Sequence, residues 1–127
     1  MYGNNENVFY YLTLMNENYQ HPAMPEGDDI AEQIIKGIYK LERVENDKST
    51  LNVQLMGSGT ILNEVRKAAQ ILCEDYNVSS DVYSVTSFNE LAREGQDVAR
   101  YNMLNPEAEQ KVPYIGQVIT KLSLIHI

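Results

Sequence analysis

Two side chains of this 127-residue chain could take part in catalysis by themselves, the imidazole of His21 and the thiol of Cys73. An imidazole exchanges protons near neutral pH, and a thiolate is a strong nucleophile. His21 lies in a proline-containing stretch, and no serine, cysteine or carboxylate stands at a recognisable catalytic spacing from it. Cys73 follows Leu72 in a helical pattern, without an evident cationic neighbour to stabilise a thiolate. We therefore expect structural roles for both residues.

A glycine-rich turn is a third candidate. Gly57–Gly59 reads Gly-Ser-Gly between a strand-like and a helical pattern, where backbone N–H groups and the helix dipole can hold an anion. It lacks the third glycine of a dinucleotide-binding fingerprint and the Gly-Lys-Ser/Thr of a P-loop. The favoured interpretation is a tight turn in which Ser58 or Thr60 caps the helix, and a weak anion site at Gly57–Thr60 is kept as an alternative.

Three acidic residues, Glu42, Glu45 and Asp47, could indicate a cation site. Their spacing matches no calcium-binding loop, so solvated side chains at a sheet edge are expected instead. With one cysteine and two histidines, the sequence shows no cluster with metal-ligand spacing. No catalytic, cofactor-binding or metal-binding residue is therefore predicted in this chain.

Composition limits the class of protein. A hydrophobic fraction of 43% over 127 residues is enough for one domain with a core. A net charge of −8 argues against nucleic acid and membrane surfaces as partners, since these attract lysine and arginine clusters. The single cysteine excludes an internal disulfide, no apolar run approaches the roughly 20 residues that span a bilayer, and Met1–Asn7 lacks the features of a signal peptide. A cytoplasmic protein is expected.

Hydrophobic periodicity predicts an α/β order of elements. The expected elements are a strand at 8–14, a connector at 16–27, a short helix capped by Asp28 or Asp29 and ended by Gly37, strands at 39–44 and 51–55, a helix at 61–76, a strand at 81–86, and a helix opened by the capping box Ser87–Glu90. The strand at 39–44 should lie at a sheet edge and pair antiparallel with 51–55 across the turn 46–49. The strand at 51–55, the helix and the strand at 81–86 should form a parallel, right-handed βαβ unit.

The apolar run Val8–Leu14 is the feature that this order does not accommodate. It reads as a buried strand, but the few residues before it cannot supply the flanking strands that it needs. The last helix is followed by the polar loop Pro106–Gln110 rather than by another parallel strand. We therefore expect the chain to be a piece of a larger protein, with the end of one domain running into the start of another.

Several stretches together resemble one enzyme family. They are Tyr10–Gly27 (YYLTLMNENYQHPAMPEG), Lys36–Leu41 (KGIYKL) with Val53–Gly59 (VQLMGSG), and Asp81–Leu104 (DVYSVTSFNELAREGQDVARYNML), and Val112–Ile119 (VPYIGQVI) continues the match. Over nearly the whole chain to Ile119, the sequence resembles the homodimeric, bacterial-type pyruvate dehydrogenases. These are the thiamine-diphosphate-dependent decarboxylating component of the pyruvate dehydrogenase complex.

The resemblance implies a division of the chain into parts of two domains. Residues 1–19 would be the tail of a pyrimidine-binding domain, with Val8–Leu14 as its last strand, and 20–36 a connector with a short helix. Residues 37–121 would be an incomplete, transketolase-like C-terminal domain of the α/β class, a βαβ unit with an edge hairpin.

The resemblance also implies a function for the longer parent. The parent would oxidatively decarboxylate pyruvate with thiamine diphosphate and magnesium, and pass the acetyl group to the dihydrolipoyl acetyltransferase core of the complex. The family's catalytic and cofactor residues lie upstream of the matched stretches, so none is carried over. The fragment alone is expected to bind no cofactor and to support the dimer. The alternatives are a fragment of another 2-oxo acid dehydrogenase or a transketolase, and a stand-alone α/β interaction module with the anion site at Gly57–Thr60.

The last six residues depart from this resemblance. Leu122–Ile127 reads LSLIHI, which is the translation of CTGTCTCTTATACACATC, a string that looks like the transposase adaptor used in sequencing libraries. Our hypothesis is that residues 122–127 are translated adaptor and not native. His126 would then have no functional meaning, and an ordinary apolar strand is the alternative.

Overall fold

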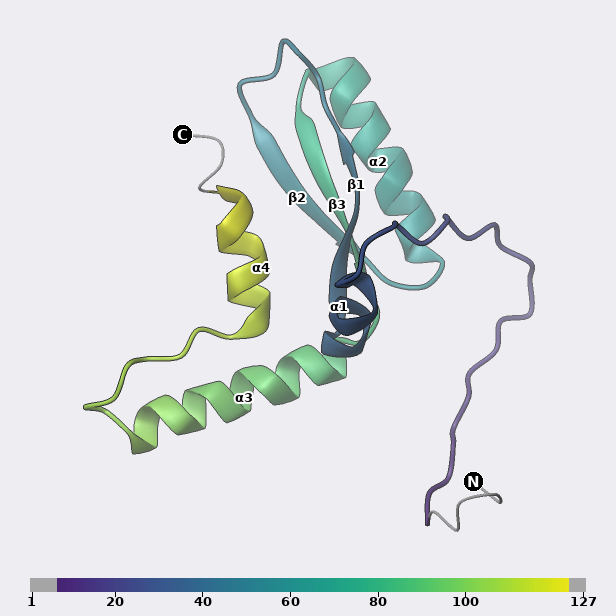
Figure 1. Cartoon of the computed structure of the whole chain (residues 1–127). Coiled ribbons are helices and arrows are strands. Elements are labelled where there is room, and N and C mark those ends of the chain that lie inside the picture. The colour runs from purple at the N-terminus through teal and green to yellow at the C-terminus, as the bar shows by residue number, and fades with distance from the viewer. Residues whose placement is uncertain (1–6, 124–127) are drawn as a thin grey trace.

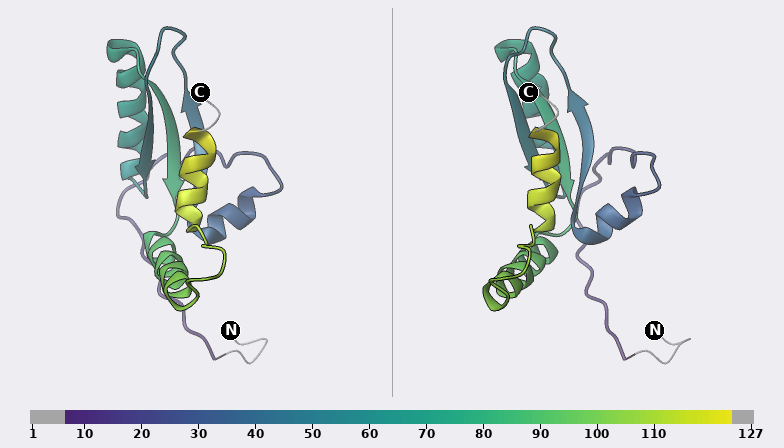
Figure 2. Two further views of the ribbon diagram at one scale, coloured as in Figure 1. Left: turned by 90° about the vertical axis from the view of Figure 1, so that its left-hand side faces the viewer. Right: turned by 60° about the vertical axis from the view of Figure 1, so that its left-hand side comes forward.

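A three-stranded sheet carries helices on both faces in the computed structural model, which describes residues 7–123 (Figure 1, Figure 2). The elements are α1 (Ile30–Lys36), β1 (Ile38–Val44), β2 (Asn52–Gly57), α2 (Ile61–Tyr76), β3 (Ser79–Val85), α3 (Phe88–Leu104) and α4 (Tyr114–Ser123). The predicted α/β class is confirmed, since α2 and α4 lie on opposite sides of the sheet.

The strand order is β1-β3-β2, so the last strand in sequence is the central one. β2 and β3 are parallel and joined through α2, which confirms the predicted βαβ unit. The predicted hairpin between 39–44 and 51–55 is wrong, because β3 lies between β1 and β2 and pairs antiparallel with β1. All seven residues of β3 are buried, and a fully buried strand belongs at the centre of a sheet. The predicted edge position of 39–44 is confirmed.

Alternate residues of β3 build the core on both faces of the sheet. On one face Val82 packs with Leu62 and Ala69 of α2. On the other face Tyr83 and Val85 pack with Ile38 of β1 and Leu91 of α3, and α4 adds Tyr114, Ile115 and Val118. The pattern indicates two thin apolar layers that share one strand.

Helix ends follow the sequence signals in part. α1 ends at Gly37, which has a left-handed φ of 104°. A Cβ at this position would lie only 2.7 Å from the carbonyl oxygen of Ser87, so glycine is needed there. Ser87 caps α3, and its Oγ accepts the backbone N–H of Glu90 at 3.1 Å. Asp29 precedes α1 but makes no capping bond through its side chain, so that part of the prediction is wrong.

Helices α1 and α3 bury few of their side chains completely. No residue of α1 is buried, and the side chain of Ile35 is 77% exposed. On α3, Phe88 is exposed and Leu91 alone is buried. α1 contacts β1, and α3 packs against α4 and places Leu91 in the core beside Ile38 and Val85.

The predicted strand at Val8–Leu14 is not formed. The structure shows no helix or strand between residue 7 and α1, and Figure 1 shows this part as an extended segment that leaves the folded body. Phe9 and Leu14 are each 89% exposed. A strand needs a neighbour for its N–H and C=O groups, and this segment pairs with no described strand. Its assignment to a preceding domain stays a prediction.

Helix α4 was not predicted from the sequence. Pro113 stands directly before it, where a missing N–H is harmless, and the backbone N–H of Tyr114 donates to Oε2 of Glu94 at 3.0 Å. The carboxylate of Glu94, on α3, thereby gives a backbone N–H at the N-terminus of α4 a hydrogen-bond partner. The backbone of residues 122 and 123 continues this helix, and the rest of the segment assigned to translated adaptor lies outside the described residues.

A charged cluster joins all three strands at Asp81. The carboxylate of Asp81 is fully buried and pairs with Nζ of Lys40 at 2.6 Å and Nη1 of Arg43 at 3.5 Å, both on β1. Its other oxygen accepts Nδ2 of Asn52, on β2, at 3.0 Å. Burial alone would raise the pKa of Asp81, but the hydrogen bonds from Lys40 and Asn52 and the charges of Lys40 and Arg43 hold that pKa below its ordinary value.

The turn after β1 is organised by Asn46. Its backbone N–H donates to Oγ of Ser79 at 3.1 Å, and its side-chain amide donates to the carbonyl oxygen of Cys73 at 2.7 Å. Its side-chain oxygen accepts the N–H of Lys48 at 2.9 Å, which closes an Asx turn. One residue thus ties the turn to α2 and to the start of β3.

Replacing Asp81 is expected to remove a pH-dependent part of stability. Because the pKa of Asp81 is lower in the folded chain, its contribution is present above the unfolded pKa of about 3.9 and is lost as the pH falls through the folded value. Asp81→Asn should lower the free energy of unfolding by roughly 1–3 kcal/mol at pH 7, measured by urea unfolding, because Lys40 and Arg43 lose their buried partner. The difference from wild type should shrink in acid. Asp97→Asn, at an exposed site, is the control. If Asp81→Asn lowered the free energy of unfolding equally at pH 7 and in acid, the pH-dependent contribution of Asp81 would be contradicted.

Removing the Asn46 side chain should loosen the turn. Asn46→Ala is expected to lower the free energy of unfolding by roughly 1–3 kcal/mol, because the Cys73 carbonyl and the Lys48 N–H lose their partner. The neighbouring Asp47→Ala, at an exposed position, should change it by less than about 0.5 kcal/mol. Equal urea midpoints for the two variants would show that the turn does not depend on Asn46.

Candidate functional site

One groove brings together two of the candidates from the sequence. It measures about 590 Å³ and lies between the connector and the first half of α2. Its polar lining includes His21, Thr60 and Asn63. The cations beside it already have partners, since Arg66 donates to both oxygens of Glu42, at 2.7 and 3.1 Å, and Lys67 pairs with Glu64 at 3.0 Å. The groove therefore offers an anion little positive charge beyond the helix N-terminus.

The turn at Gly57–Gly59 has a structural reason for its glycines. A Cβ on Gly57 would lie 2.9 Å from Cγ2 of Val65 and 3.0 Å from Cα of Leu62, so β2 and α2 approach too closely there for any side chain. Gly59 has a left-handed φ of 57°. Thr60 stands at the N-cap of α2 without a side-chain capping bond, which differs from the predicted cap. The geometry supports the tight strand-to-helix turn.

Cys73 is half-buried on α2 and takes part in the packing of the turn after β1. Its Sγ donates to the carbonyl oxygen of Glu45 at 3.6 Å, while its own carbonyl receives the Asn46 amide. The thiol is thus used as a weak hydrogen-bond donor. This arrangement supports the expected structural role.

The three acidic residues are not brought together. Glu42 binds Arg66 and Glu45 binds Arg43, while Asp47 stands in the exposed turn. Among residues 7–123, no group of three or more histidine, cysteine, aspartate or glutamate side chains is arranged to hold a metal ion.

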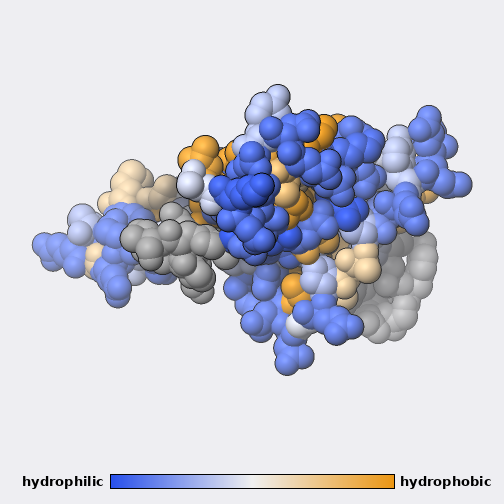
Figure 3. All heavy atoms as spheres, turned by 90° about the horizontal axis from the view of Figure 1, so that it is seen from above, coloured by the Kyte–Doolittle hydropathy of each residue, from blue (hydrophilic) through white to orange (hydrophobic). Residues whose placement is uncertain are grey.

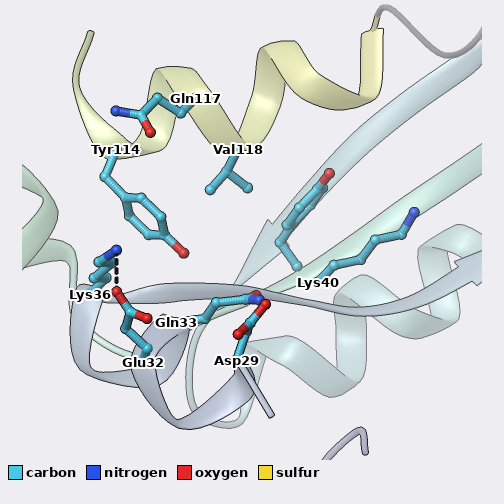
Figure 4. Close-up of a pocket in the computed structure, with 9 residues that line it drawn as sticks. Asp29, Glu32, Gln33, Lys36, Lys40, Tyr114, Gln117 and Val118 are labelled. Carbon is cyan, nitrogen blue, oxygen red and sulfur yellow. Dashed lines mark ion pairs between the residues drawn. The ribbon is translucent and has the colours of Figure 1, made fainter. Parts of the chain in front are cut away.

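A second hollow, which the sequence did not indicate, lies between α1, β1 and α4 (Figure 4). It has a volume of about 490 Å³. Lys36 and Glu32 form an ion pair of 2.6 Å at its side, and the Lys36 ammonium lies 5.1 Å from the ring centre of Tyr114. The hydroxyl of Tyr114 donates to the carbonyl oxygen of Ile38 at 3.3 Å. These contacts fasten α1 and α4 to the first strand.

Tyr83 lines the same hollow from β3 and is fully buried. Burial, with a smaller effect from the charge of Asp81, raises the pKa of Tyr83 to about 12. The phenol is protonated at neutral pH, as an ordinary tyrosine is. Its hydroxyl has no hydrogen-bond partner among the described residues, which is uncommon for a buried polar atom.

Hydrophilic residues cover most of the face shown in Figure 3, in keeping with the net charge of −8. Within the described part of the chain, none of the helices has both the length and the apolar character needed to cross a membrane. Several polar groups join one element to another, as at Asp81 and Asn46, whereas other ion pairs, such as Glu90–Arg93, lie within one helix.

Comparison with known proteins shows which family this chain matches and which proteins it is similar to. Residues 37–122 match the family described as the transketolase-like TK C-terminal domain. The chain is 62% identical over 120 residues to the pyruvate dehydrogenase E1 component of Escherichia coli K12, which covers 94% of the chain and 13% of that protein. It is 55% identical over 126 residues to the component of the same name from Haemophilus influenzae, which covers 98% of the chain and 14% of that protein.

A third relative, the pyruvate dehydrogenase E1 component of Buchnera aphidicola from Baizongia pistaciae, is 52% identical over 128 aligned residues. The chain spans only 13 to 14% of the length of these relatives. The family match covers the sheet, α2, α3 and α4, and it begins at Gly37, the residue that ends α1. From Gly37 onward, the chain belongs to the family of transketolase-like C-terminal domains.

Proposed function

We propose that the chain is part of a bacterial-type pyruvate dehydrogenase and serves a structural purpose in it. The observation that carries this proposal is the identity of 62% over 94% of the chain to a pyruvate dehydrogenase E1 component. The parent oxidatively decarboxylates pyruvate in the cytoplasm and passes the acetyl group to the dihydrolipoyl acetyltransferase core. The relatives named above all carry the same name, which favours this activity over that of another 2-oxo acid dehydrogenase or a transketolase.

We place thiamine diphosphate, magnesium and pyruvate in other parts of the longer protein, because the family match assigns residues 37–122 to a C-terminal domain. Among residues 7–123, no group of three or more acidic, histidine or cysteine side chains is arranged to hold a metal ion. This chain would contribute no catalytic residue.

The contribution of this chain is to hold a domain of the homodimer in shape. Its charged and polar side chains pair mainly within the molecule, as at Asp81, Asn46 and the Glu42–Arg66 bridge. Interactions of this kind fix the orientation of strands and helices rather than bind a substrate. The same pairing weakens the alternative of a stand-alone module with an anion site, because Arg66 and Lys67 are already matched by carboxylates.

A full-length enzyme that contains this segment tests the structural role. Asp81→Asn is expected to lower the melting temperature and to promote dissociation of the dimer, because the ion pairs that join Asp81 to β1 are lost. The kcat per intact dimer, the KM for pyruvate and the affinity for thiamine diphosphate should change less than about twofold, which is under 0.5 kcal/mol. Differential scanning fluorimetry, sedimentation and steady-state kinetics report these quantities separately.

The control for that experiment is Asp97→Asn, which removes the same charge from an exposed position on α3. It should leave both stability and kinetics unchanged. A tenfold or larger rise in KM for the stable Asp81→Asn dimer would contradict the structural role. Pyruvate turnover by residues 1–127 alone would contradict the absence of catalytic residues.

A further inference from the structure

The last turn of α1 is bound to the junction between β3 and α3. The carbonyl oxygen of Gly37 accepts the backbone N–H groups of Thr86 and Ser87, at 2.9 and 3.2 Å. Oγ1 of Thr86 donates to the carbonyl oxygen of Ile34 at 2.6 Å. The last carbonyl groups of a helix have no further turn to bond with, so they need donors from elsewhere. The junction supplies these donors, and α1 is thereby attached to a distant part of the chain although none of its side chains is fully buried.

Helices α3 and α4 add further contacts to α1. Nζ of Lys36 lies 5.1 Å from the ring centre of Tyr114, and both side chains are seen in Figure 4. The hydroxyl of Tyr114 in turn donates to the carbonyl oxygen of Ile38, the first residue of β1. A Cβ on Gly37 would lie 3.1 Å from Cγ of Leu91, on α3. Figure 1 shows α1 beside the end of the sheet at which α3 begins, so several elements hold the helix in place.

The segment before α1 is held much less firmly. Tyr19–Asp28 contains no helix or strand. Its described hydrogen bonds join Tyr19 to Glu17, at 3.1 Å, and Gly27 to Ile30, at 3.3 Å, so they connect near neighbours along the chain. The first residues of the segment lie beside α2, but a groove of about 590 Å³ lies between them and the helix. Within the described part of the chain, no hydrogen bond crosses this groove.

We propose that α1 moves as one body with the sheet and α3, and that Tyr19–Asp28 is the joint between this body and the preceding part of the parent. The inference rests on the proposed function, because it needs a preceding part in a longer enzyme. A joint forms where backbone angles can change without breaking bonds. A turn at Gly37 would break its bonds to Thr86 and Ser87, whereas a turn within Tyr19–Asp28 would break only bonds between near neighbours. The body therefore begins at α1, ahead of the family match that starts at Gly37.

Hydrogen exchange in the full-length enzyme tests how α1 is held. Thr86→Val keeps the shape of the side chain but removes the donor to Ile34, so exchange at the amides of α1 should become roughly two to ten times faster. Exchange in α2 should stay the same. Thr86→Ser restores a hydroxyl and should return the exchange of α1 to the wild-type rate. Thr50→Val, the same replacement at an exposed position in the loop before β2, is the matched control and should leave the exchange of α1 unchanged.

The wild-type enzyme tests the joint itself, since the amides of Tyr19–Asp28 should exchange faster than those of α1. Equal rates in the two segments would show that the joint lies elsewhere. An unchanged rate for α1 in Thr86→Val, or a faster rate that extends to α2, would contradict the attachment of α1 through Thr86. Pyruvate turnover is measured on the same samples. A full-length wild-type enzyme without turnover would contradict the proposed function, whereas a contrary exchange result in an active enzyme contradicts only the inference about α1 and the joint.

Discussion

The whole arrangement depends on β3 being the central strand. β1 and β2 are not paired with each other, so each belongs to the sheet only through its pairing with β3. The same strand supplies Val82 to the apolar layer under α2 and Tyr83 to the layer under α4. It also carries Asp81, whose carboxylate meets side chains from both outer strands. Removing any other strand would leave a pair, whereas removing β3 would leave none.

The parts of the fold that depend on neighbouring residues could be predicted from the sequence, whereas those that depend on pairing between distant residues could not. The helix at 61–76, the stop at Gly37 and the cap at Ser87 follow from spacing and backbone geometry within a few residues, and the structure confirms them. The position of β3 between β1 and β2 depends on a pairing between residues far apart, so the expected hairpin was wrong. The resemblance to pyruvate dehydrogenases rested on long stretches and agrees with the relatives found.

The polar interactions were the hardest part to foresee. In the sequence, Asp81 stands at the start of a predicted strand and Asn46 in a predicted turn. Their neighbouring residues do not indicate that Asp81 pairs with Lys40 or that Asn46 bonds to Cys73. The residues that did attract notice, His21, Cys73 and Glu42, are common functional types whose surroundings turn out to be ordinary. Chemical type alone suggests a site, while the role of a polar residue is decided by contacts that only the fold creates.

The end of α1 has a mechanical consequence. The carbonyl oxygen of Gly37 accepts the N–H groups of Thr86 and Ser87, at 2.9 and 3.2 Å, and Oγ1 of Thr86 donates to the carbonyl oxygen of Ile34 at 2.6 Å. The connector is therefore anchored where β3 passes into α3, and not merely at the tip of an edge strand. A force applied through the connector would act on this junction as well as on β1. The bonds of Gly37 and Ile34 to Thr86 and Ser87 would have to break before β1 could separate from β3 one hydrogen bond at a time.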